Sequence, residues 1–428
     1  MAITKTSQIR WILILWLFVL SAVAYLDRVN ISIAGKLLAA EFHLSNIQLG
    51  WIFSAFLAGY ALFQTPGGRL ADKLGARRVL ALAVVWWGIF SALIVVIPTG
   101  FQQALFVFMA LRFTLGAGEA VMFPASNQFV ARWIPSSERG LANGLIFSGV
   151  GFGAGFTPPL VTFIMLRYGW RVSFLVCAAL GLVVGFVWYL IGRNTPEEHP
   201  YISAGELSKI KAGLPTASSE EKPKLVSWAR VLQSREVLAV SLSYFTYGYV
   251  AWIFFYWFFI YLAEARGLNL KTSALYSMLP FIAMAICSPL GGLVSDAISK
   301  GKGSRAGRSG VAVFGMILAA IFLVVGSRAQ NTQLAVLVLA GGAGALYLSQ
   351  SSFWSVTADI GGASSGSVSG FMNMCNQIGG VITASLTPWI ALRVSWTAAF
   401  LVAAALCLCG ALAWLFVDPQ KRLDVARP

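Results

Sequence analysis

Two charged pairs lie inside apolar stretches of this sequence. Asp27 and Arg28 stand side by side near the end of the otherwise apolar run 13–33, which is long enough to cross a bilayer. Arg112 and Glu119 lie seven residues apart in a second apolar stretch. Seven residues are almost two helical turns, so these side chains share one helix face, about 10 Å apart along the axis. A charge at mid-bilayer costs roughly 2.5–3.5 kcal/mol on insertion scales, so all four should face a protein interior or a wet cavity.

Two carboxylates beside two guanidiniums suit a site that binds an organic anion together with protons. Arginine offers a planar fork that matches a carboxylate and keeps its charge in nearly any setting. Carboxyl groups lose their charge readily when they are desolvated. We therefore expect Asp27 and Glu119 to take up protons, and Arg28 and Arg112 to hold the anion. The alternative is that the four groups only neutralise one another as internal salt bridges, although apolar side chains in their place often stabilise a protein equally well. A third possibility combines both roles: each carboxylate holds an arginine until protonation of the carboxylate frees that arginine for the anion.

The composition is that of a membrane protein. Of 428 residues, 58% are apolar and only 11% are charged, and the mean hydropathy is +0.76. A soluble protein has about 25% charged residues. We predict an all-α polytopic protein with twelve transmembrane helices in two six-helix bundles, because lipid-exposed backbone must satisfy its own hydrogen bonds. The expected spans are 11–34, 46–70, 79–98, 103–125, 140–166, 171–192, 236–263, 272–296, 309–328, 332–358, 364–392 and 395–417.

The basic residues predict the orientation and exclude a nucleic-acid partner. If both termini are cytoplasmic, 22 of the 31 lysines and arginines fall in cytoplasmic segments and seven in outer ones. That asymmetry accounts for the net charge of +15 and indicates a multi-pass protein of a bacterial-type inner membrane, with both termini inside. A cleavable signal at Ala22-Val23-Ala24 is the alternative for the N-terminus, but cleavage would leave an odd number of spans and a reversed charge bias.

Neither the cysteines nor the histidines form a recognisable reactive or metal-binding site. All five cysteines fall in apolar spans, where they are small core residues, and both histidines, His43 and His199, fall in loops. We expect no metal and no cofactor. A membrane-embedded enzyme has little support, because acid-base chemistry would need converging histidine, cysteine or carboxylate groups.

A polar break divides the chain into halves. We expect an N-terminal bundle over 1–193, a cytoplasmic linker over 194–234 with a short amphipathic helix at 203–214, and a C-terminal bundle with a short tail over 235–428. The halves carry an internal repeat, because the second and eighth spans both end with a glycine four residues before an aspartate: Gly68 with Asp72, and Gly292 with Asp296. In the fifth span, Gly151 and Gly155 are spaced to let another helix approach closely.

Twelve spans in a 6+6 arrangement, with Gly-Gly-Arg-Leu-Ala-Asp-Lys-Leu-Gly-Ala-Arg-Arg at 67–78 and a degraded copy ending at Asp296, resemble the major facilitator superfamily. The resemblance implies two halves that rock about a central site to give alternating access. It also implies cytoplasmic gating contacts at Gly68, Asp72, Arg77 and Asp296. The physical reason is that aspartate can cap a neighbouring helix N-terminus and pair with arginine, contacts that break when the halves separate. The alternative is that Asp72 and Arg77 follow only the charge bias of cytoplasmic loops.

The sequence resembles one branch of that superfamily more narrowly, the anion:cation symporters, which include bacterial carriers of galactonate, glucarate and hexuronates. The likeness covers Tyr-Leu-Asp-Arg-Val-Asn-Ile-Ser at 25–32 and the segment from Arg112 to Glu119. It implies proton sites at Asp27 and Glu119 and a carboxylate contact at Arg28 or Arg112. It further implies neutral substrate contacts, at Tyr25, Tyr60, Ser351, Trp354 and Asn373.

The expected function is import of a small organic anion, most simply a sugar acid, by proton symport in a monomer driven by the proton gradient. Related vesicular carriers have an extra arginine early in the seventh span, whereas Tyr244-Phe245-Thr246-Tyr247-Gly248-Tyr249 has no charge, which speaks against a strongly dianionic substrate. The aromatic run 252–259 leaves aromatic acids and other monocarboxylates open. Further alternatives are an exporter on the same fold and a ligand-sensing membrane receptor.

Overall fold

The computed structural model describes residues 7–44, 46–214, 225–258, 261–262 and 265–423, and within these residues all regular secondary structure is helical. The first half contains α1 (Ile9–Phe42), α2 (Asn46–Leu74), α3 (Ala76–Val95), α4 (Ala104–Glu119), α5 (Met122–Trp133), η1 (Ser136–Glu138), α6 (Arg139–Tyr168) and α7 (Trp170–Ile191). The connecting segment contains η2 (Pro196–Glu198), α8 (Ala204–Gly213) and α9 (Trp228–Gln233). The second half contains α10 (Arg235–Tyr256), α12 (Leu270–Lys302), α13 (Ser304–Arg328), α14 (Thr332–Leu348), α15 (Gln350–Gly361), η3 (Gly362–Ser364), α16 (Ser365–Arg393), α17 (Trp396–Ala413) and η4 (Trp414–Phe416).

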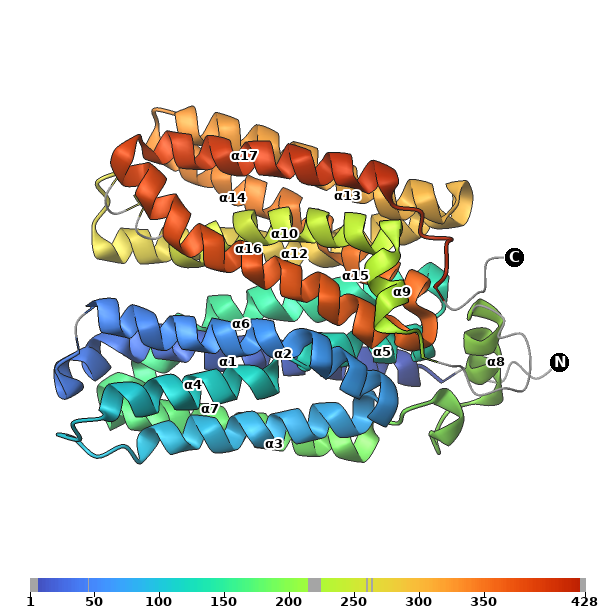
Figure 1. The fold of residues 1–428 in the computed structure, drawn as a ribbon, viewed down its shortest axis with the longest axis horizontal. Helices are drawn as coiled ribbons and strands as arrows, with labels where there is room; N and C mark the ends of the chain where they lie inside the picture. The colour runs from blue at the N-terminus through green and yellow to red at the C-terminus, as the bar shows by residue number, and fades with distance from the viewer. Residues whose placement is uncertain (1–6, 45, 215–224, 259–260, 263–264, 424–428) are drawn as a thin grey trace.

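These helices form twelve membrane spans, which confirms the predicted fold class. Nine stretches of the described residues are long and apolar enough to cross a membrane, and one of them, 332–393, holds both the tenth and the eleventh span. The helices α2 and α6 complete the set. Figure 1 shows α1 to α7 lying together as one layer and α10 to α17 as the other, with both termini and α8 at the same end of the molecule, hereafter the linker end.

Several helices extend beyond the predicted spans, because helical hydrogen bonding continues past the apolar part of a sequence. The clearest cases are α1 and α12, which each continue for at least six residues past the predicted end of the span. The expected amphipathic helix of the linker is α8, whose N-cap Ser203 accepts a hydrogen bond from the Glu206 N–H. Part of the linker, 215–224, and part of the predicted seventh span, at 259–260 and 263, lie outside the described residues.

The fourth and tenth spans, which occupy the same place in the two halves, are both interrupted near the middle. The fourth span breaks between α4, which ends at Glu119, and α5. The tenth breaks between α14 and α15, which begins at Gln350. Interrupted helices at membrane depth are tolerated where the backbone is buried in protein, and in transporters they often form binding sites. The side chains beside the two breaks are therefore candidates for a binding site.

Close helix crossings hold the two halves together at the linker end. A Cβ atom added to Gly68 of α2 would lie 2.0 Å from the carbonyl oxygen of Gly366 in α16, and one added to Gly292 of α12 would lie 2.1 Å from that of Gly140 in α6. Only glycine fits at such distances. Gly151 lies at a third close crossing, against α12, whereas a Cβ atom on Gly155 would meet nothing within 4 Å, so only the first of this predicted pair makes a close approach.

Candidate functional site

Arg28 and Glu119 form a buried ion pair between α1 and α4. The Arg28 Nε donates a hydrogen bond of 2.6 Å to Glu119 Oε1, and the two side chains are 6% and 1% exposed. The Arg28 guanidinium lies over the Tyr60 ring, 4.2 Å from its centroid, and over the Tyr25 ring, 4.7 Å from its centroid. The outer atoms of the pair, Arg28 Nη2 and Glu119 Oε2, have no hydrogen-bond partner among the described residues. The pair is therefore incompletely satisfied and open to a further partner.

Asp27 points away from Arg28, into the interior of the first half. Its carboxylate accepts a hydrogen bond from Ser91 Oγ of α3, at 2.9 and 3.0 Å from its two oxygens. Successive helical residues point about 100° apart, which separates the side chains of the Asp27-Arg28 pair. Asp27 is 3% exposed and is not among the residues that line the cavity described below.

Arg112 of α4 is buried in the same half, with 3% of its surface exposed. Its guanidinium lies 4.5 Å from the centroid of the Phe56 ring, and its Nε and Nη1 have no hydrogen-bond partner among the described residues. The hydrogen bonds therefore join Arg28 to Glu119 and Ser91 to Asp27. All four charged side chains are buried in the first half, and Arg28 lies against the aromatic rings of Tyr25 and Tyr60.

A small cavity of about 30 Å³ lies between the halves. Its wall contains Tyr25, Tyr60, Phe123, Phe147 and Val150 from the first half, and Tyr244, Tyr247, Ala251, Trp252, Phe255, Tyr347, Gln350, Asn373, Asn376 and Gln377 from the second. The first half thus contributes mostly rings beside the Arg28 cation, and the second contributes most of the amide and phenol groups. A cavity of this volume holds about two water molecules.

Several polar atoms around this cavity have no partner among the described residues. They are Tyr60 Oη, Tyr247 Oη, Gln350 Oε1 and Gln377 Oε1. Leaving such a group unsatisfied in a protein interior costs about 1–3 kcal/mol. A ligand or water with hydroxyl groups would satisfy them, so the wall is chemically suited to a polar guest.

The structure divides the neutral residues predicted from the sequence into two groups. Tyr25, Tyr60 and Asn373 line the cavity, and Asn373 Nδ2 donates a 2.9 Å hydrogen bond to Gln64 Oε1 across the halves. Ser351 and Trp354 are buried but do not line it.

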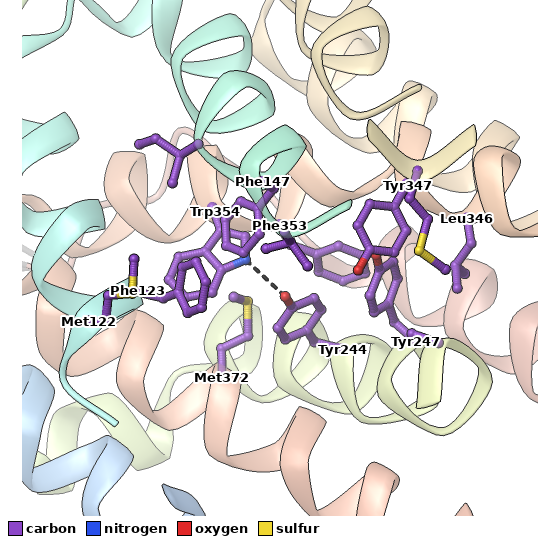
Figure 2. Close-up of a cluster of buried hydrophobic side chains, with 14 of the residues drawn as sticks. Met122, Phe123, Phe147, Tyr244, Tyr247, Leu346, Tyr347, Phe353, Trp354 and Met372 are labelled. Carbon is purple, nitrogen blue, oxygen red and sulfur yellow. Dashed lines mark hydrogen bonds between the residues drawn. The ribbon is translucent and has the colours of Figure 1, made fainter. Parts of the chain in front are cut away.

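Trp354 supports the wall from behind. Its Nε1 donates a 2.9 Å hydrogen bond to Tyr244 Oη, and its ring packs against Phe147 and Phe123 of the first half, at centroid distances of 4.9 and 5.9 Å. Figure 2 shows this layer, with Tyr244 between Trp354 and the ring of Tyr247. The tryptophan therefore positions Tyr244 instead of facing the cavity.

Six polar residues of the wall were not predicted from the sequence, and all of them belong to the second half: Tyr244, Tyr247, Tyr347, Gln350, Asn376 and Gln377. The spacing of some of these residues in the sequence does indicate a shared polar face. Asn373, Asn376 and Gln377 lie three and four residues apart in an apolar span, so they share one helix face. A polar stripe of that kind inside a membrane faces protein or water.

Two aspartates close the linker end in the same way, one from each half. Asp72 accepts hydrogen bonds from the backbone N–H groups of Gly366 and Ser367, at 2.9 and 2.8 Å, and from Ser367 Oγ at 2.5 Å. These groups form the N-terminus of α16, in the other half. A carboxylate there is stabilised by the free N–H groups and the helix dipole.

Asp296 repeats the contact in the opposite direction. It accepts from the N–H groups of Gly140 and Leu141 at the start of α6, at 3.0 and 2.7 Å, and from Arg308 Nη1 at 2.5 Å. Arg308 Nη2 also donates to the Ser136 carbonyl oxygen of the first half at 2.6 Å. The predicted gating residues Asp72 and Asp296 therefore both join the halves.

Arg77, which was expected to join the halves, contacts only its own half in the described residues. Its Nε donates to the Tyr189 carbonyl oxygen, and its guanidinium lies 4.6 Å from the Tyr189 ring centroid. Among the described residues, an ion pair between the halves comes instead from Arg139, which pairs with Asp359, whereas Arg308 pairs with acids of its own half and reaches the first half only through the Ser136 carbonyl oxygen. Arg77 lies at the start of α3, where its backbone N–H donates to Asn194 Oδ1 and its side chain reaches α7 of the same half.

The linker adds contacts at the same end. The Val226 N–H donates to Ser364 Oγ of the second half, and its carbonyl oxygen accepts from Arg69 Nη1 of α2, both at 2.9 Å. In α8, Glu206 is fully buried and accepts from Arg10 Nη1 at 2.9 Å. The linker is thus attached to the start of α1 and also bridges the halves beside Asp72.

Comparisons with known proteins agree with this architecture. The family model described as Major Facilitator Superfamily matches residues 17–384 and 303–428. The chain is similar to the probable sulfoacetate transporter SauU of Cupriavidus necator, with 34% identity over 94% of this chain and 92% of the relative. It is also similar to the hexuronate transporter of Bacillus subtilis, with 32% identity over 95% and 94% of the two chains, and to the probable galactarate/D-glucarate transporter GarP of Escherichia coli, with 30% identity over 99% and 98%.

Among solved structures, the proton:xylose symporter XylE has the same fold, with a TM-score of 0.77 and 17% identity over 98% of both chains. At that identity the likeness concerns the fold alone. The match over most of the chain, the twelve spans in two halves and the paired aspartates at the linker end agree with one another. The chain belongs to the major facilitator superfamily and is a membrane transporter, not an enzyme.

Proposed function

We propose that this protein imports a small organic anion, most favourably a sugar acid, together with protons. The observation that carries the proposal is the incompletely satisfied Arg28–Glu119 pair beside a cavity with unpaired polar atoms. The names of the relatives, which refer to sulfoacetate, hexuronate and galactarate or D-glucarate, support an anionic cargo.

In the proposed cycle, Glu119 acts as a proton-dependent holder of Arg28. While it is ionised, Glu119 occupies Arg28 through a 2.6 Å charge-assisted hydrogen bond. When Glu119 takes up a proton, its attraction for Arg28 falls, and the guanidinium can instead donate hydrogen bonds to the carboxylate of the anion. Proton uptake and anion binding then favour each other, which is the requirement for symport.

Asp27 and Arg112 would form the second couple of the cycle. Asp27 is held by Ser91, and it is not among the residues that line the cavity. In this proposal Asp27 takes up a proton without touching the anion, and Arg112 adds positive potential behind the site. Two titratable carboxyls would allow two protons to move with a monoanion.

The hydroxyl groups of a sugar acid would bind to the second half of the wall. Gln350, Gln377 and Tyr247 offer unpaired polar atoms there, and Asn373 offers an amide shared with Gln64. Tyr25 and Tyr60 would lie beside the carboxylate, because they flank Arg28. Ser351 and Trp354 would act from behind the wall.

The charge distribution supports the orientation of the protein. The linker end carries most of the basic residues, so we place it in the cytoplasm of an inner-membrane protein, with both termini inside. The contacts of Asp72, Asp296 and Val226 close that end, so the described state would exclude the cytoplasm from the cavity. Each chain has its own two halves and cavity, so we expect a monomer to suffice.

Uptake into liposomes tests the proposal. Purified protein is reconstituted, an inside-alkaline pH gradient is imposed, and accumulation of radiolabelled D-glucarate and D-galactonate is measured with and without a protonophore. We expect gradient-dependent accumulation in the wild type. In Glu119→Gln we expect loss of uphill uptake with exchange retained, because the amide is neutral at every pH. Accumulation that ignores the pH gradient, or full active uptake by Glu119→Gln, would remove the proposed coupling.

A compact monoanion is the second candidate cargo. The cavity is small, and Phe123, Phe147, Trp252 and Phe255 give much of its wall an apolar aromatic surface. Such a wall favours a cargo with few hydroxyl groups, such as a short sulfonate or an aromatic acid. The same uptake assay with sulfoacetate and benzoate as competitors separates the candidates: strong inhibition by either, with none by the sugar acids, favours the compact cargo.

A further inference from the structure

One hydrogen bond of the central cavity wall crosses between the two halves. Asn373 of α16 lines the cavity, and its Nδ2 donates to Gln64 Oε1 of α2 at 2.9 Å. Within the described part of the chain, no other cavity-lining residue forms a hydrogen bond with the opposite half. A cargo in the cavity can therefore act directly on a contact between the halves at this bond.

Gln64 is buried next to the cation of the site. Its exposed fraction is 0%, and its Nε2 has no hydrogen-bond partner among the described residues. Tyr60 lies one helical turn before Gln64 on the same face of α2. The Tyr60 ring lines the cavity, and the Arg28 guanidinium lies 4.2 Å from its centroid. Tyr60 and Gln64 thus connect the cation of the first half with the Asn373 amide of the second.

Gln64 is also the first of three positions on one face of α2 that meet α16. Gln64, Gly68 and Asp72 are four residues apart, so they share a face and span about 12 Å along the helix axis. A Cβ atom added to Gly68 would lie 2.0 Å from the Gly366 carbonyl oxygen, and Asp72 accepts from the Gly366 N–H at 2.9 Å. This row of contacts, hereafter the α2–α16 seam, runs from the cavity wall to the closed linker end.

The central cavity is too small for a sugar acid in the described state. Its volume holds about two water molecules, and a sugar acid is several times larger. Cargo entry therefore needs the wall to widen, and widening between α2 and α16 stretches the Gln64–Asn373 bond. An asparagine amide that loses its partner can bond to a hydroxyl or carboxylate oxygen of the cargo instead.

We propose that cargo breaks the Gln64–Asn373 bond, and that Gln64 thereby couples cargo occupancy to opening of the linker end. An empty carrier keeps the bond and stays closed, whereas a loaded carrier gives Asn373 to the cargo and loses one contact of the α2–α16 seam. Cargo binding breaks the bond only in the closed state, because in the open state the bond is already absent. The cargo therefore favours the open state by the free energy of that bond. The proposal rests on the proposed function, because it places the cargo in the central cavity.

Energy transfer between two dyes measures the coupling. The dyes are attached at Arg78→Cys and Arg305→Cys, two exposed positions at the linker end of opposite halves, in a cysteine-depleted background. The ratio of open to closed molecules is measured in nanodiscs without cargo and with saturating D-glucarate or sulfoacetate. The quantity of interest is the cargo factor, which is the ratio with cargo divided by the ratio without it.

Variants of Gln64 test whether the bond contributes to the cargo factor. A neutral hydrogen bond corresponds to about fivefold in an equilibrium constant. Gln64→Leu should therefore raise the ratio without cargo about fivefold and lower the cargo factor about fivefold, because cargo no longer has this bond to break. Gln64→Asn keeps an amide but shortens the side chain by one methylene, so it should act in the same direction without placing an apolar group against Asn373.

Thr65→Val is the matched control on the same seam. Thr65 Oγ1 donates to Met374 Sδ across the halves at 3.4 Å, and neither residue lines the cavity. Loss of this bond should raise the ratio without cargo and leave the cargo factor unchanged, because cargo binding does not break it. A residue that only stabilises the closed state should behave like Thr65, so the cargo factor separates coupling from stability.

The cargo factors of the four proteins decide the proposal. A factor that falls in both Gln64 variants and not in Thr65→Val supports it. An unchanged factor in both Gln64 variants, with a clear response of the wild type to either anion, overturns the role of Gln64 and leaves the proposed transport function intact. A factor that falls equally in Thr65→Val also overturns it, since any loosening of the seam would then suffice. A wild type that responds to neither anion contradicts the proposed cargo and the coupling together.

Discussion

Replacing Asp72 with asparagine should open the linker end of the protein. Asp72 accepts three hydrogen bonds from the N-terminus of α16, and both of its oxygens act only as acceptors, as in an ionised carboxylate. Hydrogen bonds to a charged group contribute about 1.5–3 kcal/mol each, against about 0.5–1.5 kcal/mol for neutral ones. Asparagine keeps one oxygen and turns its amide towards the other donor. We therefore expect a loss of about 2 kcal/mol from the closed state, which is a roughly 30-fold increase in the ratio of open to closed molecules.

Pulsed electron spin resonance measures that ratio. Spin labels are attached at Lys73→Cys and Lys300→Cys, two exposed positions at the linker end of opposite halves, in a cysteine-depleted background. Asp72→Asn should move population from the short to the long distance, and Asp296→Asn should act in the same direction because its contacts are equivalent. Asp418→Asn is the control, since Asp418 accepts a local hydrogen bond from the Gln420 N–H. An unchanged distance distribution in Asp72→Asn would refute the assignment of the closed state to this contact.

Three further changes test other parts of the structure. Ser364→Ala removes the acceptor for the Val226 N–H of the linker, a bond of about 1 kcal/mol, and should increase the open population about fivefold in the same distance measurement. Ser365→Ala is the control and should leave the distances unchanged, because the Ser365 hydroxyl has no partner among the described residues. Gly68→Ala places a Cβ atom 2.0 Å from a backbone oxygen and should lower uptake more than tenfold while shifting the labels apart. Glu41, whose pKa is lowered to about 2 chiefly by the hydrogen bond from Arg171, should stabilise the protein above pH 4.5 and lose that effect as the pH falls towards 2. Thermal unfolding of Glu41→Gln should therefore differ from wild type above pH 4.5, by about 1 kcal/mol or less for so exposed a pair, and converge with it at low pH.

The sequence predicted the fold well because membrane spans depend on composition. A run of apolar residues must become a helix in lipid whatever surrounds it, so length and hydropathy sufficed for the twelve spans. The repeat of glycine and aspartate at the ends of the second and eighth spans predicted that Asp72 and Asp296 have equivalent environments. Their partners in α16 and α6 could not be read from the sequence, because they depend on how the halves pack.

The pairing of the central charges also depended on packing. Spacing alone puts Arg112 and Glu119 on one face, yet Glu119 bonds to Arg28 of another helix, because the long Arg28 side chain reaches from α1 to α4. Helix rotation likewise turns Asp27 towards Ser91 and away from its neighbour. A one-dimensional pattern predicts which face a residue occupies, and only the packed helices decide which partner it meets.

The location of the central ion pair constrains how cargo and protons could move the halves. Arg28 and Glu119 both belong to the first half, so separating them changes no contact between the halves. The two carboxylates that join the halves at the linker end, at about 2 kcal/mol each, together lower the ratio of open to closed molecules by about a thousandfold. A ligand shifts such an equilibrium only by its difference in affinity for the two states. In the proposed cycle the cargo must therefore contact Arg28 and the second half at once, and Gln350 and Gln377 offer the unpaired atoms for that bridge. An anion that reaches Arg28 alone should bind, inhibit and remain on the side from which it came.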